Sequence, residues 1–113
     1  MLEMWKNKEQ KVYGKMEMKK MTYNIDESII ARSVDHYGEE IQATVCMEEC
    51  AELIQAISKA KRGKIDLDNM VEEIADVLIC IEMLKQMYMI SDEEINKWIE
   101  KKQAREAERM EKE

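Results

Sequence analysis

The chain has 113 residues with no proline and three glycines, and it carries a formal net charge of −7. Charged residues make up 38% and aromatic residues 5%, which is typical of a helical domain with a Met, Leu and Ile core. The acidic balance argues against general nucleic-acid binding, which needs a basic surface. No apolar run approaches the roughly 20 residues that span a bilayer, and the charged N-terminus lacks a signal-peptide core. We therefore expect one cytoplasmic domain with no membrane or nucleic-acid partner.

The three cysteines, Cys46, Cys50 and Cys80, fall within apolar helical patterns. This placement predicts reduced cysteines in the core of a cytosolic protein. Zinc is not expected, because the one histidine, His36, forms no ligand spacing with them.

The first predicted element is an extension over residues 1–24, which shows no sustained period of two or 3.6. We expect it to be partly helical at most and to become ordered only against a partner. Asp26 predicts the N-cap of a short helix over residues 27–36. The sequence His36-Tyr37-Gly38 then indicates a break.

A second helix is predicted over residues 39–61, with Gly63 suited to the position after its end. At 100° per residue its apolar side chains form one broad stripe, made of Ala43, Cys46, Met47, Cys50, Leu53, Ile54 and Ile57. The adjoining face mixes apolar residues with the carboxylates of Glu48, Glu49 and Glu52. A purely solvated face would more often alternate lysine and glutamate along its whole length.

A short link over about 63–66 leads to a third helix, capped by Asp66 or Asp68 and ending near residue 89. Its second half, 77–84, is apolar nearly all round. Such a helix is central in a bundle, so its carboxylates are expected near the core.

Ser91 and Glu94 fit a capping box that opens a fourth helix over 92–109. The end of the chain, 106–113, is nearly all charged and is expected to fray. The chain thus divides into an extension at 1–24, a helical domain at 25–109 and a charged tail at 110–113.

Two acidic pairs stand out, Glu49 with Glu52 and Glu73 with Asp76. Residues three apart share a helix face, so each pair presents two carboxylates together. The short link makes the two helices antiparallel neighbours. The pairs lie roughly 16 Å and 13 Å from the turn at 1.5 Å per residue, which places all four carboxylates at nearly one level.

Like charges set in apolar sequence are costly unless a cation compensates them. An all-oxygen ligand set favours Mg²⁺, Mn²⁺ or Ca²⁺ over Zn²⁺. A di-iron bundle would need Glu-x-x-His motifs, and the chain has none. The competing interpretation is that these acids form solvated helix faces or pair with nearby lysines.

The two acidic segments, 48–56 (EECAELIQA) and 72–78 (EEIADVL), resemble the signature of the MazG family. That family belongs to the all-α nucleoside triphosphate pyrophosphatases, with the dimeric dUTPases and phosphoribosyl-ATP pyrophosphatases. Tyr37-Gly38 and Gln42 also resemble short phage and bacterial members, and the resemblance covers roughly 33–105. It implies an all-α bundle of about four helices around an antiparallel hairpin, completed by assembly into a homodimer or homotetramer.

The resemblance also implies the chemistry. Members hydrolyse a nucleoside triphosphate to the monophosphate and pyrophosphate with Mg²⁺, for which Mn²⁺ is the alternative, and such activity would suit clearance of non-standard or excess nucleotides. By this resemblance the metal ligands are Glu49, Glu52, Glu73 and Asp76. Glu48 or Glu52 would serve as the general base.

The substrate contacts suggested by the resemblance are Lys101 and Arg105, which share a face of the fourth helix. Gln42 would contact the base or support the site, and Trp98 would stack on the base or pack in a core or interface. A solvated basic face is the competing interpretation for the two cations. The rival function is a non-catalytic helical oligomer that binds nucleotides or regulates a partner; a pyrophosphatase of a histidine-pathway intermediate ranks third.

Overall fold

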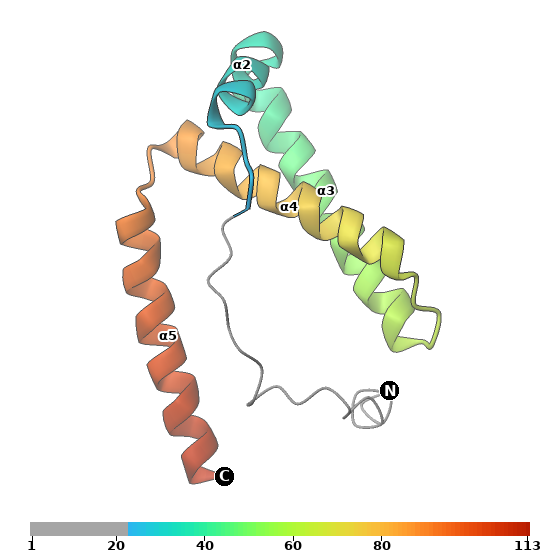
Figure 1. Ribbon diagram of the computed structural model, residues 1–113, viewed down its shortest axis with the longest axis vertical. Helices are drawn as coiled ribbons and strands as arrows, with labels where there is room; N and C mark the ends of the chain where they lie inside the picture. The colour runs from blue at the N-terminus through green and yellow to red at the C-terminus, as the bar shows by residue number, and fades with distance from the viewer. Residues whose placement is uncertain (1–22) are drawn as a thin grey trace.

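A computed structural model of the chain describes residues 23–113, so the predicted extension at 1–24 lies almost wholly outside the described residues. The described part is all-α (Figure 1). Its helices are α2 (Glu27–Tyr37), α3 (Glu39–Lys61), α4 (Leu67–Tyr88) and α5 (Asp92–Lys112). The predicted fold class is confirmed, and the bounds of the first three helices differ from the predicted ones by a residue or two at most.

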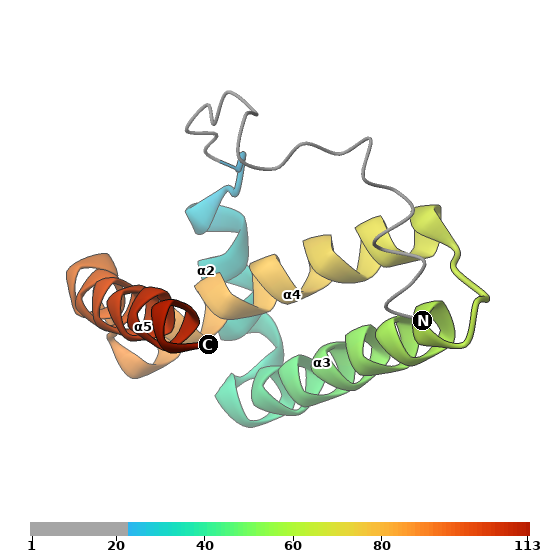
Figure 2. The ribbon, with the colours of Figure 1, turned by 90° about the horizontal axis from the view of Figure 1, so that it is seen from below.

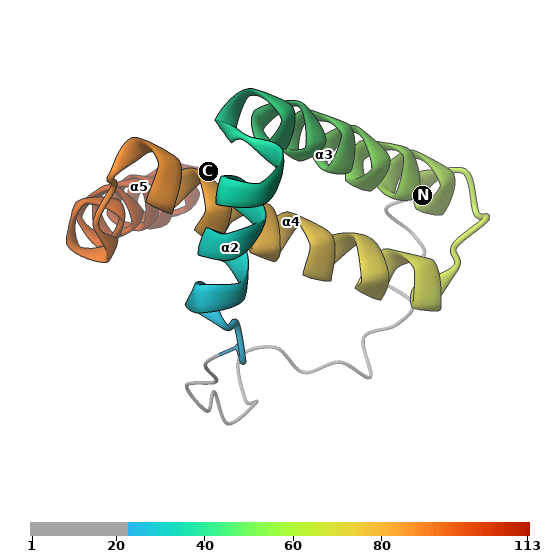
Figure 3. The ribbon, with the colours of Figure 1, turned by 90° about the horizontal axis from the view of Figure 1, so that it is seen from above.

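Helices α3 and α4 form an antiparallel hairpin, and α2 packs against both of them near the end that is away from the α3–α4 link (Figures 1 and 3). Helix α5 leaves the far end of α4 and makes no close backbone contact with α2, α3 or α4 (Figure 2). Within residues 23–113, every helix is too short or too polar to cross a membrane.

Side-chain caps fix where the helices begin. The Asp26 carboxylate accepts hydrogen bonds from the Ser28 hydroxyl at 2.6 Å, from Ile29 N at 3.3 Å and from Ser28 N at 3.0 Å. These hydrogen bonds, that of the hydroxyl most of all, hold the pKa of Asp26 below its usual value. Asp66, rather than Asp68, caps α4. Each of these caps satisfies backbone donors that have no partner inside the first helical turn.

Gly38 joins α2 to α3 with φ 96° and ψ 150°, a backbone conformation that only glycine adopts readily. Its N–H donates to Val34 O at 2.7 Å, which closes α2, and its own C=O accepts from Gln42 N at 3.0 Å, which begins α3. One residue therefore ends one helix and starts the next, and its conformation sets the angle between them.

The buried core is small and lies where α2 meets the hairpin. Ile30, Cys46, Cys80 and Met83 form it, each with at most 5% of its surface exposed. Partly buried apolar residues surround it, namely Ile25, Val34, Leu84 and Met87. All three cysteines are free, but only Cys46 and Cys80 are buried, so the expectation of a core position fails for the exposed Cys50.

The apolar stripe predicted for α3 does not face α4 as a whole. Met47 and Ile54 are 72% and 66% exposed, whereas Gln42, Cys46 and Ala56 are buried. The helix is rotated so that the mixed face with Glu49 meets α4, and much of the purely apolar surface is left outside. The hydrophobic period locates the apolar side of α3 but does not say which face packs against the neighbouring helix, so it did not predict this rotation.

Helix α5 continues to Lys112 and so extends past the predicted end at residue 109. Two ion pairs within the helix support its last turns, Glu106 with Arg109 at 3.3 Å and Glu108 with Lys112 at 3.9 Å. The charged end therefore stabilises the helix locally instead of fraying.

Candidate metal centre

Four carboxylates converge between α3 and α4. Each of Glu49, Glu52, Glu73 and Asp76 offers one oxygen, and these oxygens all lie within 4.8 Å of one another. The first pair comes from consecutive turns of α3 and the second from consecutive turns of α4, because residues three apart share a helix face. The convergence expected from the spacing is thus present.

The cluster is partly buried. Glu73 is only 7% exposed and Glu49 is half-buried, while Glu52 lies at the solvent edge. Among the described residues, Glu49 Oε2 and Glu73 Oε2 are buried without a hydrogen-bond partner. Buried carboxylate oxygens without partners are costly, so the arrangement lacks a compensating group.

The pKa values of two carboxyl groups in the cluster are raised. Burial, reinforced by the Asp76 carboxylate, raises the pKa of Glu49 from its ordinary value of 4.5 to about 7. Burial and then the Glu52 carboxylate raise the pKa of Glu73 as well. Among residues 23–113, no cation forms a salt bridge with this cluster.

A sulfur-containing layer adjoins the carboxylates. The Cys46 thiol lies 3.7 Å from the Cys80 carbonyl oxygen and 3.9 Å from Met83 Sδ. Cys46 lies about one helical turn from Glu49 on α3, and Cys80 lies about one turn from Asp76 on α4. Burial raises the pKa of the Cys80 thiol to about 12, so this thiol is not a nucleophile at neutral pH.

The donor set fits a hard divalent cation. All four ligand groups are carboxylates, and Mg²⁺ or Mn²⁺ prefers oxygen ligands of this kind. A cation bound there would satisfy the two buried oxygens and offset both the burial and the repulsion that raise the pKa values of Glu49 and Glu73. In proteins, Mg²⁺ commonly bridges carboxylates of this kind to substrate phosphates.

The other predicted site residues lie elsewhere. Glu48 is exposed and outside the four-carboxylate cluster. Gln42 is buried, and its amide donates to the Ser33 hydroxyl at 3.3 Å; this Ser33 contact was not anticipated from the sequence, because the α2–α3 angle that creates it is a tertiary feature.

Trp98, Lys101 and Arg105 lie on α5, which makes no close backbone contact with the hairpin. The Trp98 ring is 56% exposed, and the ammonium groups of Lys101 and Lys102 lie 5.0 Å and 5.9 Å from its centroid. Among the described residues, no α5 cation therefore reaches the carboxylate cluster within a single subunit.

The all-α hairpin and its cluster of four carboxylates define the class as a helical protein with an all-oxygen donor set that could hold a metal ion. The family comparison identifies it further: residues 38–110 match the MazG nucleotide pyrophosphohydrolase domain, and the chain belongs to that family. The match includes both acidic pairs and most of α5. Comparisons with curated proteins and with solved structures gave no significant match.

Proposed function

We propose that the protein is a Mg²⁺-dependent nucleoside triphosphate pyrophosphohydrolase, with Mn²⁺ as the alternative ion, that converts a (d)NTP to the (d)NMP and pyrophosphate. The observation that carries the proposal is a pair of buried carboxylate oxygens, Glu49 Oε2 and Glu73 Oε2, inside a four-carboxylate cluster; neither has a hydrogen-bond partner in the part of the chain that the structure describes. Membership of the MazG family supports the reaction class. A cytoplasmic role in clearing non-standard or excess nucleotides would suit this activity.

The proposed metal ligands are Glu49, Glu52, Glu73 and Asp76. A bound Mg²⁺ would offset the charge of the triphosphate and lower the pKa of a coordinated water. In the reaction the water oxygen bonds to the α-phosphorus, the bond to the bridging oxygen breaks, and pyrophosphate leaves. The proton passes to a general base, for which Glu52 is favoured over Glu48 because Glu52 belongs to the cluster and also reaches solvent.

The substrate contacts are proposed to come from a second subunit. Lys101 and Arg105 would bind phosphate and Trp98 would stack on the base, but their helix makes no close backbone contact with its own hairpin. Exposed apolar side chains on α3 and α4 supply surface for assembly into a homodimer or homotetramer, among them Met47, Ile54, Ile57, Val71 and Ile74. Gln42 is proposed to support the site through Ser33 rather than to contact the base.

The proposed activity is tested by pyrophosphate release with Mg²⁺ across ribo- and deoxynucleoside triphosphates, including dUTP and dCTP. Glu52→Gln should abolish turnover in a folded protein, whereas Glu48→Gln, which alters the neighbouring carboxylate outside the cluster, should retain most of it. Release of phosphate instead of pyrophosphate, or turnover that survives Glu52→Gln, would contradict the proposal.

Subunit mixing tests the contribution of the partner. Glu52→Gln subunits carry an intact α5, and Lys101→Ala/Arg105→Ala subunits carry an intact cluster. If α5 acts on the neighbouring subunit, mixed oligomers regain activity that neither variant shows alone. If α5 acts on its own subunit, mixing the variants gives no recovery.

The second candidate is a non-catalytic helical oligomer that binds nucleotides or regulates a partner. It is favoured by one observation, the distance of the α5 cations from the carboxylates of their own subunit. A folded oligomer that binds a nucleotide with Mg²⁺ but releases no pyrophosphate from any substrate would support this candidate.

A further inference from the structure

The junction between α4 and α5 contains a three-charge cluster. Lys85 Nζ lies 2.8 Å from Glu82 Oε2, three residues earlier on α4, and it also pairs with the Asp92 carboxylate at the first residue of α5. Among the described residues, this ion pair is the one side-chain hydrogen bond or salt bridge that joins α5 to α2, α3 or α4. Lys85 thus joins two helices that otherwise share only the link.

The link itself is short and well defined. Met89 adopts the left-handed conformation with φ 54°, and Ile90 N donates to Lys85 O at 2.9 Å, which closes α4. Ser91 then caps α5 by accepting from Glu94 N at 3.1 Å. With no packing surface between α5 and the hairpin, the direction of α5 depends on these few backbone angles and on the Lys85–Asp92 pair.

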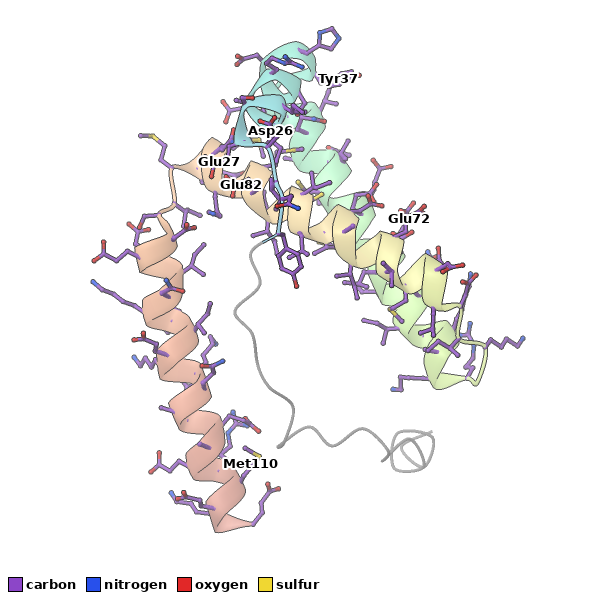
Figure 4. The ribbon with its side chains drawn as sticks, viewed as in Figure 1. Asp26, Glu27, Tyr37, Glu72, Glu82 and Met110 are labelled. Carbon is purple, nitrogen blue, oxygen red and sulfur yellow. The ribbon has the colours of Figure 1, made fainter. Side chains whose placement is uncertain are left out.

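The α4 side of the junction is held firmly. Gln86 Nε2 donates to Glu27 O on α2 at 3.0 Å, so the last turns of α4 are anchored to α2. Figure 4 labels Glu27 on α2 and Glu82 on α4, where these two helices meet. Glu82 is only 9% exposed, and a carboxylate at that depth requires a cation, which keeps Lys85 in place. Asp92, which raises the pKa of Lys85 most, followed by Glu82, helps keep its ammonium charged.

We infer that Lys85 is a positioning residue: anchored on Glu82, it holds Asp92 and so fixes the direction in which α5 presents its cations to a second subunit. Its functional consequence rests on the proposed function, in which Lys101 and Arg105 bind the triphosphate at the neighbouring carboxylate cluster. Lys85 itself, at the α4–α5 junction, does not belong to that cluster.

Asp92→Asn is the sharpest variant, because Asp92 is exposed and the change leaves the Lys85–Glu82 pair intact. Glu93→Gln is the matched control: it removes the same charge from the same helical turn, so it has a similar effect on the helix dipole, but Glu93 has no ion-pair partner in the described residues. Asp92→Asn should raise the KM for the nucleotide about threefold with kcat nearly unchanged, and Glu93→Gln should change neither.

The direction of α5 can be measured independently of enzymatic activity, from the distance between two labels. Spin labels at Lys64→Cys and Gln103→Cys, both exposed, are introduced in a Cys50→Ser background and diluted with unlabelled protein so that pairs lie within one subunit. Asp92→Asn should broaden or shift the distance distribution relative to Glu93→Gln. Lys85→Arg should keep the distribution of the parent protein, because guanidinium retains both ion pairs.

The outcomes separate the two proposals. Identical distance distributions for Asp92→Asn and Glu93→Gln overturn the positioning role of Lys85, whatever the activity. A shifted distribution with an unchanged KM overturns its functional consequence. If the parent protein releases no pyrophosphate, the proposed function is wrong. The distances between the spin labels still decide whether Lys85 directs α5. A double variant, Lys85→Met/Glu82→Gln, removes both charges of the pair and so leaves no buried charge without a partner. It checks that the shift in the distance distribution does not come from misfolding.

Discussion

Glu49 and Glu73 face each other from α3 and α4, and each has a buried oxygen, Oε2, that finds no hydrogen-bond partner within residues 23–113. Folding thus brings two acids together in a partly dry site. Such an arrangement weakens the metal-free protein, and it gives a divalent cation a place where binding relieves both burial and repulsion.

Metal binding should therefore stabilise the protein. Mg²⁺ or Mn²⁺ at about a hundredfold excess over its Kd should add about 2.7 kcal/mol to the free energy of unfolding, because only the folded state assembles the four ligands. Glu73→Gln should remove this metal-dependent gain and raise the melting temperature of the metal-free protein by relieving repulsion. Thermal melts with and without the ion measure both effects.

Exposed acids provide the control for that experiment. Glu40→Gln removes one charge from the first turn of α3, outside the cluster, and should leave the metal-dependent gain intact. Equal metal stabilisation of Glu73→Gln and Glu40→Gln would show that the ion binds elsewhere.

The stability of the metal-free protein should fall as pH rises. The pKa of Glu49 is about 7 in the folded protein and 4.5 ordinarily, so between these values the folded state binds more protons than the unfolded state. The stabilisation is fully present below about pH 4.5 and is lost as pH rises through 7. Glu73 shifts in the same direction. Chemical denaturation at pH 5.5 and 8.0 in EDTA measures the difference.

Glu49→Gln should flatten this pH dependence, since it removes the carboxyl group whose pKa is raised to about 7. Saturating Mg²⁺ at pH 8.0 should restore the stability that the metal-free protein loses there, because the ion takes the place of the proton. A metal-free protein that becomes more stable between pH 5.5 and 8.0 would contradict the assignment.

Gly38→Ala should destabilise the protein by about 1–3 kcal/mol. A Cβ at Gly38 would meet no atom within 4 Å, so the cost arises from the backbone conformation alone. Gly38→Asn should give no rescue, because ψ of 150° lies outside the left-handed helical region that asparagine tolerates. Urea denaturation measures the change in unfolding free energy, and a change of less than about 0.5 kcal/mol would be neutral.

Met83→Ala should cost about 2–3 kcal/mol of unfolding free energy, because Met83 is 5% exposed and central to a small core. Met110→Ala, on an exposed α5 side chain with 60% exposure, is the control and should change stability by less than about 0.5 kcal/mol. Similar losses for both variants would mean that α5 is packed in solution to the same degree as the core.

The helices were predictable because their signals are local. Asp26, Gly38 and Ser91 cap or break helices through bonds to residues two to four positions away, and the structure places these signals where the sequence indicated. The meeting of the two acidic pairs was also predictable, since a short link and a fixed rise per residue determine their level. The rotation of α3 was not, because it depends on which face packs best against α4.

The sequence by itself determined an all-α chain with two carboxylate pairs at one level of a hairpin, since helical period, caps and link length are properties of neighbouring residues. Only the tertiary structure decided that Glu49 and Glu73 bury oxygens without partners, that Gln42 bonds Ser33, and that α5 stands away from its own hairpin. Those features depend on how helices distant in sequence orient against one another. That orientation follows from side-chain packing and charge pairing across the fold, which local patterns do not encode.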